Sequence, residues 1–441
     1  MTAPDPIAQA RAFVETGRRP RAHIRRIQRR RLAALVEHAR RHSPYYREVL
    51  PPGSELDTLP TLDKTTLMER FDDIVCDPRL RRDVLLEHLA GPGGHAPYLG
   101  EYRVMRTSGA SGRKGVFVYD EAGWAGYVGQ FLGVTALMGM PLWERPGIRV
   151  TVVTAADPAH ASAQVALSCA TRGLADIHPV PVTLPLADIV DALNACEPEW
   201  LHAYASFAAL LADERRARRL RIAPRIVTTS SELLTADMAR RVEAGFGVRA
   251  FDFYATTEGL WAAQCPEHAG FHAFEPWTII ENVDAGGRPV PDGESGARIL
   301  LTNLFNRVQP LIRYELPDVI TIDPEPCACG RTLSRIAAVH GRRDDLLRID
   351  GVTVHPLQFA AIAADPEVRE FQVVQRGDRL TLRLVVAEGA AVGGTCERMR
   401  DRVASALRGA GVAEPSLDVE PCASIDRPPG GKLQLVVAAR P

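Results

Sequence analysis

The sequence predicts an α/β protein built from at least two domains, and three observations lead to this prediction. First, 441 residues are more than a single hydrophobic core ordinarily serves. Second, from about residue 100 short apolar runs alternate with helical patterns, which is typical of a sheet with crossover helices. Third, the pattern changes near residue 344, where a small α+β segment begins.

Composition argues against several classes of protein. Apolar residues make up 46% of the chain and charged residues 24%, which is the balance of a soluble globular protein. The formal net charge of -1 gives no overall basic excess, so we expect no nucleic-acid partner. No apolar run approaches the roughly 20 residues that span a membrane, and the opening MTAPDPIAQARAFVETGRRP has no hydrophobic signal region. We therefore expect a cytoplasmic protein without a membrane partner, whose eight cysteines are thiols or metal ligands.

The N-terminal region predicts helices. The basic run from Arg18 to Arg31 leads into a segment whose apolar residues recur at helical spacing. Such a charge run is ordinarily the solvated face of a helix. Residues 59–67 then predict a turn followed by a short helix that begins at an Asp or Thr cap.

The central region predicts strands in alternation with helices. Helical segments such as 186–194 separate the expected strands, which are 150–154, 176–182, 199–204 and 225–230. Residues 273–315 differ, because short strands alternate there with turns such as Pro-Asp-Gly-Glu-Ser-Gly. This pattern predicts a small antiparallel or barrel-like subdomain.

The last hundred or so residues predict a separate α+β module. Its expected elements are a helix near 357–364, a hairpin over 370–389 with Arg-Gly-Asp at its turn, a helix over 395–409 and a final strand pair. We place the boundary near Asp344, which gives domains 1–343 and 344–441.

The stretch RTSGASGRKGVFVYD (106–120) joins a Gly- and Ser-rich loop to an apolar strand. Gly109 and Gly112 are three residues apart and Lys114 is followed by Gly, so the loop does not have Walker A spacing. One interpretation is a hairpin-like surface turn. The other is a phosphate-binding loop, in which both glycines expose backbone N–H groups as an anion nest. In that case the hydroxyls and cations would come from Thr107, Ser108, Ser111, Arg113 and Lys114.

Four further segments accompany this loop, namely FYATTEG (253–259), RYELPD (313–318), GRRDD (341–345) and PPGGKL (428–433). In this order the five segments resemble the adenylate-forming superfamily. Within it the chain looks most like the phenylacetate–CoA ligase family, which also has the Pro-Tyr-Tyr-Arg and Leu-Pro-x-Leu-x-Lys stretches found here at 44–47 and 59–64. The resemblance runs from about residue 25 to 435.

The resemblance implies a large N-terminal adenylate-forming domain and a mobile small C-terminal domain. It implies that ATP and Mg²⁺ activate a small-molecule carboxylic acid as an acyl-adenylate with release of pyrophosphate, and that a thiol then takes the acyl group. CoA is the first choice of acceptor. The alternatives are loading of a carrier-protein pantetheine or formation of an amide or N–N bond in specialised metabolism. A nucleotide-binding protein without catalysis and a homodimer both remain open.

The resemblance also implies roles for individual residues. The β- and γ-phosphates would be held by the loop, through Thr107, Ser108, Gly109, Ser111, Gly112 and Arg113. Thr257 would contact the α-phosphate and Glu258 would bind Mg²⁺, which prefers carboxylate oxygen; the alternative for Glu258 is an ordinary helix-capping acid. The nucleoside would be bound by Ser231 and Glu232 near the adenine, Tyr254 stacked on it, and Asp318 and Arg342 on the ribose. Pro317 departs from the family, which usually has Gly before the Asp, and removes a backbone donor.

Two residues of the C-terminal region complete the implied machinery. Lys432 would act in adenylation as a mobile point charge between the carboxylate and the α-phosphate; the alternative is an ordinary surface lysine. Asp344 would be the hinge of the C-terminal domain.

By resemblance the acyl pocket would be lined by Trp124, Tyr127, Phe131, His160, Tyr204, Ser206, Phe207 and Ala255. This mixture of aromatic and small side chains suits an aryl or small acid, although core packing explains most of the aromatic residues equally well.

The cysteines cluster only in Cys-Pro-Glu-His-Ala-Gly-Phe-His (265–272) and at Cys327 and Cys329. Three cysteines and one histidine make a tetrahedral zinc set without an open position, which favours a structural role over a catalytic one. The phenylacetate–CoA ligase-like branch includes members with such a zinc knuckle, here the segment 265–330. Cys-x-x-His spacing favours His268, but we choose His272; free thiols are the alternative.

Overall fold

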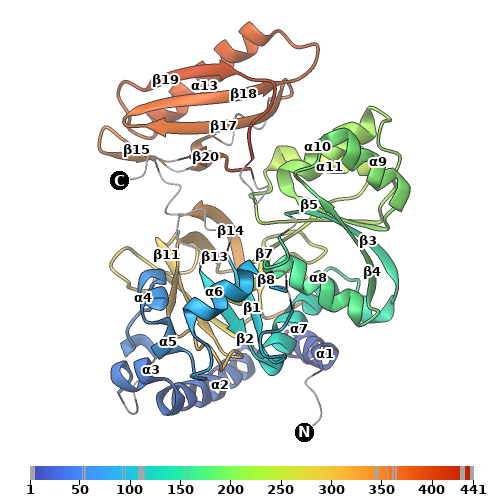
Figure 1. The fold of residues 1–441 in the computed structure, drawn as a ribbon. Helices are drawn as coiled ribbons and strands as arrows, with labels where there is room; N and C mark the ends of the chain where they lie inside the picture. The colour runs from blue at the N-terminus through green and yellow to red at the C-terminus, as the bar shows by residue number, and fades with distance from the viewer. Residues whose placement is uncertain are drawn as a thin grey trace. The chain divides into compact units, whose positions relative to one another are not determined.

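The computed structural model describes residues 5–51, 53, 56–91, 93–94, 96–107, 115–155, 157–342, 347–354, 356–359, 362, 365–427 and 433–437. The chain divides into two compact units (Figure 1). Unit 1 comprises Met1–Ile148, Asp157–Ile177 and Phe253–Val339, and unit 2 comprises Arg149–Ala156, His178–Asp252 and His340–Pro441. The predicted boundary at Asp344 lies outside the described residues, and the division into 1–343 and 344–441 stays a prediction.

Unit 1 opens with a series of helices, two of which the sequence predicted, at residues 21–42 and 64–69. They are α1 (Pro6–Thr16), α2 (Arg21–His42), α3 (Pro44–Val49), the 3₁₀ turn η1 (Leu56–Thr58), α4 (Lys64–Glu69), α5 (Phe71–Ile74) and α6 (Arg82–Ala90). Helix α4 begins where the sequence predicted, and Asp63 is its cap because its Oδ1 accepts a hydrogen bond from the Thr66 N–H at 2.7 Å. Ser43 caps α3 in the same way. The buried Tyr46 hydroxyl then donates to the Pro310 carbonyl at 2.8 Å, so this stretch is anchored to the body of the unit.

Unit 1 continues through β1 (Arg103–Arg106), β2 (Val116–Tyr119), α7 (Glu121–Leu137), η2 (Leu142–Glu144) and α8 (Ala161–Thr171). Strands β7 (Phe251–Ala255), β8 (Trp261–Ala263), β9 (Phe271–Ala273), β13 (Asp318–Asp323) and β14 (Arg335–Arg342) are neighbours in the order β13-β14-β9-β8-β7. A separate sheet has the order β10 (Thr278–Val283), β11 (Arg298–Asn303) and β12 (Tyr314–Leu316), with both pairs antiparallel. The antiparallel subdomain predicted for residues 273–315 is therefore present.

Unit 2 begins as a parallel sheet covered by helices. Its strands are neighbours in the order β6 (Ile226–Ser230), β5 (Trp200–Tyr204), β3 (Ile148–Thr154) and β4 (Ala175–Pro181). The pairs β3·β5 and β5·β6 are parallel. Helices α9 (Leu186–Cys196), α10 (Ala205–Arg216) and α11 (Ala236–Phe246) lie together beside these strands (Figure 1). Their apolar faces share one core with the strands, which includes Ile189, Leu211 and Leu201. The predicted strands and crossover helix are confirmed.

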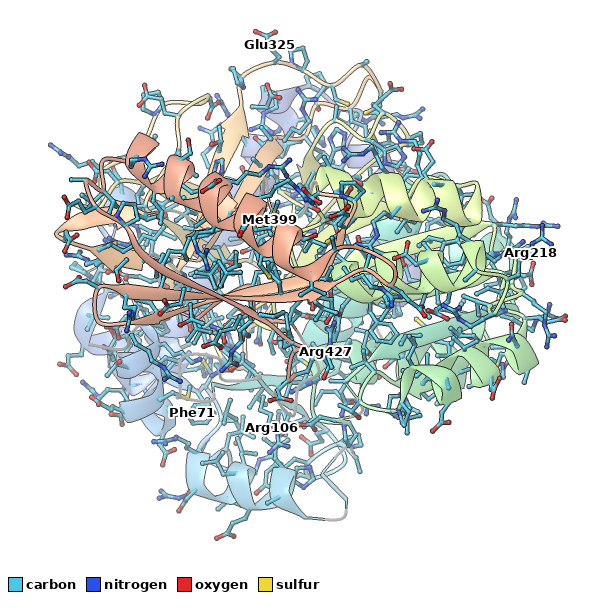
Figure 2. All side chains as sticks on the ribbon, turned by 90° about the horizontal axis from the view of Figure 1, so that it is seen from above. Phe71, Arg106, Arg218, Glu325, Met399 and Arg427 are labelled. Atoms are coloured by element: carbon cyan, nitrogen blue, oxygen red, sulfur yellow. The ribbon has the colours of Figure 1, made fainter. Side chains whose placement is uncertain are left out.

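The C-terminal segment of unit 2 is a small α+β module. It contains β15 (Leu347–Ile349), β16 (Val352–Val354), the 3₁₀ turn η4 (Pro356–Phe359), β17 (Val368–Arg376), β18 (Arg379–Val386), α13 (Val392–Gly409), β19 (Ser416–Pro421) and β20 (Val436–Val437). The predicted hairpin is β17–β18, which turns at Gly377 and Asp378. Helix α13 carries the buried Met399 (Figure 2) into the core of the module.

The prediction of a final strand pair is wrong. The sheet order is β19-β18-β17-β20, so the last two strands lie at opposite edges. Each pairs in parallel with one strand of the hairpin, β19 with β18 and β20 with β17. The reason is that a central hairpin offers an open edge on each side, and each later strand satisfies one of them. Of the helix predicted near 357–364, the structure describes the 3₁₀ turn η4 and the α-helical residue Ile362.

Within the described part of the chain, no helix is both long enough and apolar enough to cross a membrane.

The buried His202 on β5 makes the stability of unit 2 depend on pH. Its Nδ1 lies 3.0 Å from Thr228 Oγ1 and its Nε2 lies 3.4 Å from Ser230 Oγ. Burial lowers the pKa of His202 to about 4. As the pH decreases, His202 is protonated near pH 6.5 in the unfolded chain but only near pH 4 in the folded chain. Between these two values protonation favours the unfolded chain, so the free energy of unfolding decreases.

We expect this histidine to lower the free energy of unfolding by about 3 kcal/mol as the pH falls from about 7 to 4. Urea unfolding at several pH values should show a smaller pH dependence for His202→Asn than for the wild type. The exposed His42→Asn should keep the wild-type dependence. Equal slopes for His202→Asn and wild type would contradict the prediction.

Candidate active site

A tight turn between β7 and β8 carries Thr257 and Glu258. The Thr256 N–H donates to the Leu260 carbonyl at 2.9 Å, and the Gly259 N–H donates to the Thr256 carbonyl at 3.1 Å. The Glu258 residue is 7% exposed. The chain enters β8 immediately after the turn, so Glu258 caps no helix, and the helix-capping alternative is wrong. The antiparallel pairing of β7 with β8 forces this reversal instead.

Three side chains hold the backbone of this turn from behind. The Tyr127 hydroxyl donates to the Thr256 carbonyl at 2.9 Å and the Tyr119 hydroxyl to the Thr257 carbonyl at 2.7 Å. Asn303 Nδ2 donates to the Glu258 carbonyl at 2.8 Å. Burial is the main cause that raises the pKa of both tyrosines, and the charge of Glu258 adds to it, so both hydroxyls stay protonated and can donate. Every carbonyl from Thr256 to Glu258 thus has a fixed donor.

Sequence reasoning missed Tyr119 and Asn303 as parts of this arrangement. Tyr119 is the last residue of β2, at the end of the strand that follows the Gly- and Ser-rich loop, and this position was the only available signal. Tyr127 was predicted to line the acyl pocket. Its ring stacks on Trp124 at a centroid distance of 5.3 Å, and its hydroxyl donates a hydrogen bond to the Thr256 carbonyl of the turn.

The Gly- and Ser-rich loop connects the two strands of an antiparallel hairpin. Arg106 pairs with Val116 at the last register position of β1 and β2. The Thr107 N–H donates to the Gly115 carbonyl at 3.0 Å, and the Gly115 N–H donates back to Thr107 Oγ1 at 2.9 Å. Lys64, the last residue of the Leu-Pro-x-Leu-x-Lys stretch, places its Nζ 3.4 Å from the same Oγ1 and adds a cation at the base of the loop. Ser108, Gly109, Ser111, Gly112 and Arg113 lie outside the described residues.

An ion-pair cluster lies beside the start of this loop. Arg106 (Figure 2) donates to Asp157 Oδ2 from Nη2 at 2.7 Å and from Nε at 3.1 Å. His160 Nε2 lies 3.6 Å from the same oxygen. Burial by itself would raise the pKa of Asp157, but the Ala159 N–H and the Arg106 guanidinium lower it, so the carboxylate is charged. The predicted pocket residue His160 therefore lies next to this ion pair.

The remaining predicted residues of unit 1 lie on strands and one helix. Asp318 is the first residue of β13 and is buried. Tyr254 and Ala255 end β7, and the Phe131 ring on α7 lies 6.0 Å from that of Trp261. Arg342 ends β14. Asp344 and Lys432 lie outside the described residues.

The predicted residues of unit 2 gather around the start of α10. Glu232 Oε2 accepts a hydrogen bond from the Ser206 N–H at 2.9 Å, and Ser231 before it has a left-handed φ of +68°. Burial raises the pKa of Glu232, while Arg427 and the N–H groups of Ser206 and Leu433 oppose that shift. The Tyr204 hydroxyl accepts from the Ala155 N–H at 3.1 Å. Sequence reasoning did not foresee Arg427.

Unit 1 brings three cysteines and one histidine together. The ligand atoms of Cys265, His272, Cys327 and Cys329 all lie within 4.8 Å of one another. The Sγ atoms of Cys265 and Cys327 are 3.7 Å apart, and Cys329 Sγ lies 3.3 Å from His272 Nε2. His268 instead turns its Nδ1 toward Gln264 Oε1, at 3.3 Å.

The cluster has the donors and spacing that a tetrahedral zinc ion needs. Sulfur ligands about 2.3 Å from such an ion lie about 3.8 Å from each other, and the Cys265–Cys327 separation agrees. Burial lowers the pKa of His272 to about 4, so its imidazole is neutral, which is the form that binds metal. Four such ligands would complete a tetrahedron and leave no position for water.

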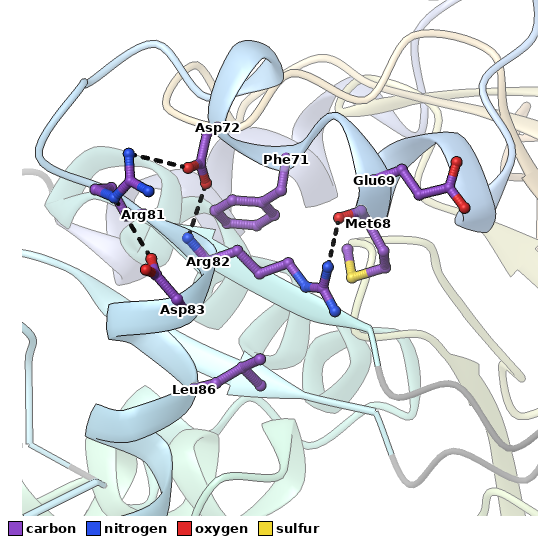
Figure 3. Close-up of a pocket in the computed structure, with 8 residues that line it drawn as sticks. All are labelled: Met68, Glu69, Phe71, Asp72, Arg81, Arg82, Asp83 and Leu86. Atoms are coloured by element: carbon purple, nitrogen blue, oxygen red, sulfur yellow. Dashed lines mark hydrogen bonds and ion pairs between the residues drawn. The ribbon is translucent and has the colours of Figure 1, made fainter.

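A surface cavity of about 410 Å³ lies elsewhere in unit 1, between α4, α5 and α6 (Figure 3). Both arginines that line it have partners among the lining residues. Arg81 lies 3.4 Å from Asp72 and 3.5 Å from Asp83, and the Arg82 guanidinium donates to the Met68 carbonyl at 3.0 Å. The predicted site residues do not line it, so we do not assign it to the active site.

Comparison with known proteins identifies structures that share this fold. No model of a protein family matches the chain. The solved structure of a 2-hydroxyisobutyryl-CoA ligase in the postadenylation state is similar with a TM-score of 0.75 and 23% identity, covering 96% of this chain and 90% of that one. The fold is thus that of the adenylate-forming CoA ligases.

Curated relatives indicate which kind of CoA ligase the chain is similar to. The phenylacetate-coenzyme A ligase of Thermus thermophilus is 29% identical over 399 residues, which cover 84% of this chain and 83% of the relative. That of Escherichia coli is 28% identical over 228 residues, which cover 47% and 49%. The chain is therefore similar to phenylacetate–CoA ligases, and the predicted resemblance is confirmed.

Proposed function

We propose that this protein is an AMP-forming acid–thiol ligase that activates an aryl or small carboxylic acid with ATP and transfers it to CoA. One observation carries the proposal. A chain with this fold holds the buried Glu258 beside Thr257 in a turn whose three carbonyls each have a fixed donor. Such rigidity suits chemistry that depends on positioning and electrostatics.

The chemistry has two steps. A carboxylate oxygen of the acid attacks the α-phosphorus of ATP, and the bond to the bridging oxygen breaks to release pyrophosphate. The sulfur of CoA then attacks the acyl carbon, and AMP leaves with the electrons of the acyl–oxygen bond. Thr257 contacts the α-phosphate, Lys432 supplies positive charge there, and Asp318 holds the ribose.

Mg²⁺, when bound, neutralises phosphate charge and polarises the phosphoryl oxygens. Glu258 is its ligand, because a buried carboxylate suits a hard cation that prefers oxygen. The loop that starts at Thr107 binds the β- and γ-phosphates, and Lys64 adds a cation at its base.

Acid-dependent ATP–pyrophosphate exchange against a panel of aryl and small acids tests this function. We expect exchange with at least one acid, reduced about 10²–10³-fold in Lys432→Ala because one charged group at the α-phosphate is lost. Adding CoA, a pantetheine carrier or an amine to the active acid then identifies the acceptor. A protein that binds ATP but exchanges pyrophosphate with no acid would be a non-catalytic nucleotide-binding protein and would contradict the proposal.

The cysteine–histidine cluster, in turn, holds a structural Zn²⁺ through Cys265, His272, Cys327 and Cys329. The interatomic distances and the neutral imidazole support this assignment. A set of four protein ligands would leave no open position, so the ion would stabilise unit 1 and take no part in the reaction.

A further inference from the structure

Charged side chains inside unit 2 join the C-terminal module to helix α10. The Arg427 guanidinium (Figure 2) donates to Glu370 Oε1 at 2.6 Å and to Ser206 Oγ at 3.3 Å, and it lies 3.8 Å from Glu232 Oε1. Its Cζ is 5.7 Å from the centre of the Phe207 ring. The side chains of Arg427 and Glu232 are 13% and 6% exposed, so this contact is shielded from water.

Glu232 connects two parts of the chain with one carboxylate. Its Oε2 accepts from the N–H of Ser206, in the first turn of α10, where backbone donors lack helical partners and the helix dipole favours a negative charge. Its Oε1 accepts from the N–H of Leu433 at 2.7 Å. Leu433 is the residue that follows Lys432 in the sequence.

The segment that begins at Leu433 otherwise belongs to the module. Strand β20 pairs with β17 at Val373 and Val436, and the Val373 N–H donates to the Leu435 carbonyl at 2.8 Å. Gln372 Nε2 donates to the Gln434 carbonyl at 3.0 Å. The hydrogen bond from the Leu433 N–H to Glu232 therefore connects this segment to the start of α10, where Glu232 also accepts from Ser206.

A second ion pair joins the same two elements. Arg369 on β17 lies 3.6 Å from Glu214 on α10. The contact with Arg427 thus lies on a surface where the module and α10 already attract each other.

We propose that Glu232 and Arg427 are positioning residues for acid adenylation, because they hold the amide of Leu433, the residue after Lys432 in the sequence, at the start of α10. The proposal rests on the proposed function, in which Lys432 acts at the α-phosphate. Arg427 neutralises the buried Glu232 carboxylate, and that carboxylate then binds the Leu433 amide. Transfer of a preformed acyl-adenylate to CoA does not use the charge of Lys432 at the α-phosphate and should depend much less on this contact.

Two half-reactions test the proposal in the full-length protein. Arg427→Ala should reduce acid-dependent ATP–pyrophosphate exchange about thirtyfold or more, as expected when one partner of a buried charge pair is removed. Transfer from a synthetic acyl-adenylate to CoA should stay close to wild type. Arg427→Lys should restore part of the exchange, because lysine keeps the charge but lacks the forked donor geometry. Equal losses in both half-reactions, or no loss in either, would overturn the proposal.

The matched control is Arg379→Ala. Arg379 pairs with Asp418 at 3.0 Å within the same module, and both side chains are largely exposed. We expect wild-type values in both half-reactions. A loss in this variant similar to that of Arg427→Ala would show that any arginine lost from the module has the same effect, and would overturn the specific role of Arg427.

Hydrogen exchange without substrates separates this proposal from the proposed function. In Arg427→Ala, peptides that contain residues 433–437 should exchange faster than in wild type and in Arg379→Ala. Unchanged exchange would overturn the positioning role even in an active enzyme. A wild type that activates no acid would overturn the proposed function, and with it the catalytic part of the inference, whatever the exchange data show.

Discussion

Replacing Gly259 by alanine is expected to reduce acid-dependent ATP–pyrophosphate exchange by about a hundredfold, because displacing a catalytic group by about 1 Å has an effect of this size. Gly259 follows Glu258 in the turn between β7 and β8 and has a φ of +102°. A Cβ added there would lie 2.3 Å from Asn303 Nδ2, the atom that donates to the Glu258 carbonyl. The added methyl must therefore push Asn303 away from the backbone that it holds.

The same substitution should also lower the free energy of unfolding by about 3 kcal/mol, since backbone strain and a steric clash add together. Gly139→Ala is the matched control. Gly139 has a φ of +83°, and a Cβ there would meet no atom within 4 Å, so this variant reports backbone strain alone. It should lose about 1–2 kcal/mol and keep its activity. Urea unfolding and exchange assays measure both quantities, and a fully active Gly259→Ala would show that the geometry of the turn is not needed for adenylation.

Removal of the metal is expected to lower the stability of the folded chain strongly. The purified protein should contain one zinc ion per chain by elemental analysis. With free zinc at about a thousandfold its dissociation constant, metal binding stabilises the folded chain by about 4 kcal/mol, and a chelator should remove that stabilisation. The measurement is urea unfolding with and without chelator.

Cys327→Ser should lose the zinc, because it removes one of the four ligands. Cys169→Ser should keep it, since Cys169 is a buried cysteine of α8 that lies outside the cluster. The free-thiol alternative would be supported instead by two results together. The wild type would contain no zinc and its three cluster cysteines would react freely with a thiol reagent, and its stability would not change when zinc is added.

Much of the fold could be predicted because it depends on local patterns. The strands at 150–154, 199–204 and 225–230 and the helix near 186–194 follow from the alternation of apolar runs. The start of α4 follows from the side chain of Asp63, which acts only three residues away. The order of the five motif segments can be read directly from the sequence, and it predicted the resemblance to adenylate-forming enzymes.

Non-local contacts decided the rest. Sequence spacing favoured His268 for the cluster, but β9 pairs with β14 at His272 and Arg335, which brings His272 beside the cysteines at 327 and 329. The last two strands separated because each sheet edge of the hairpin accepted one of them. Glu232 met Arg427, 195 positions further along the chain, only through the docking of the C-terminal module on α10.

The sequence by itself therefore determined which chemical groups the protein has and the local elements that carry them, because caps, turns and periodicity act over a few residues. The tertiary structure decided which of those groups meet. Tyr119, Tyr127 and Asn303 converge on one turn, and Glu232 bridges α10 and Leu433, because strand pairing and burial join segments that no local pattern relates.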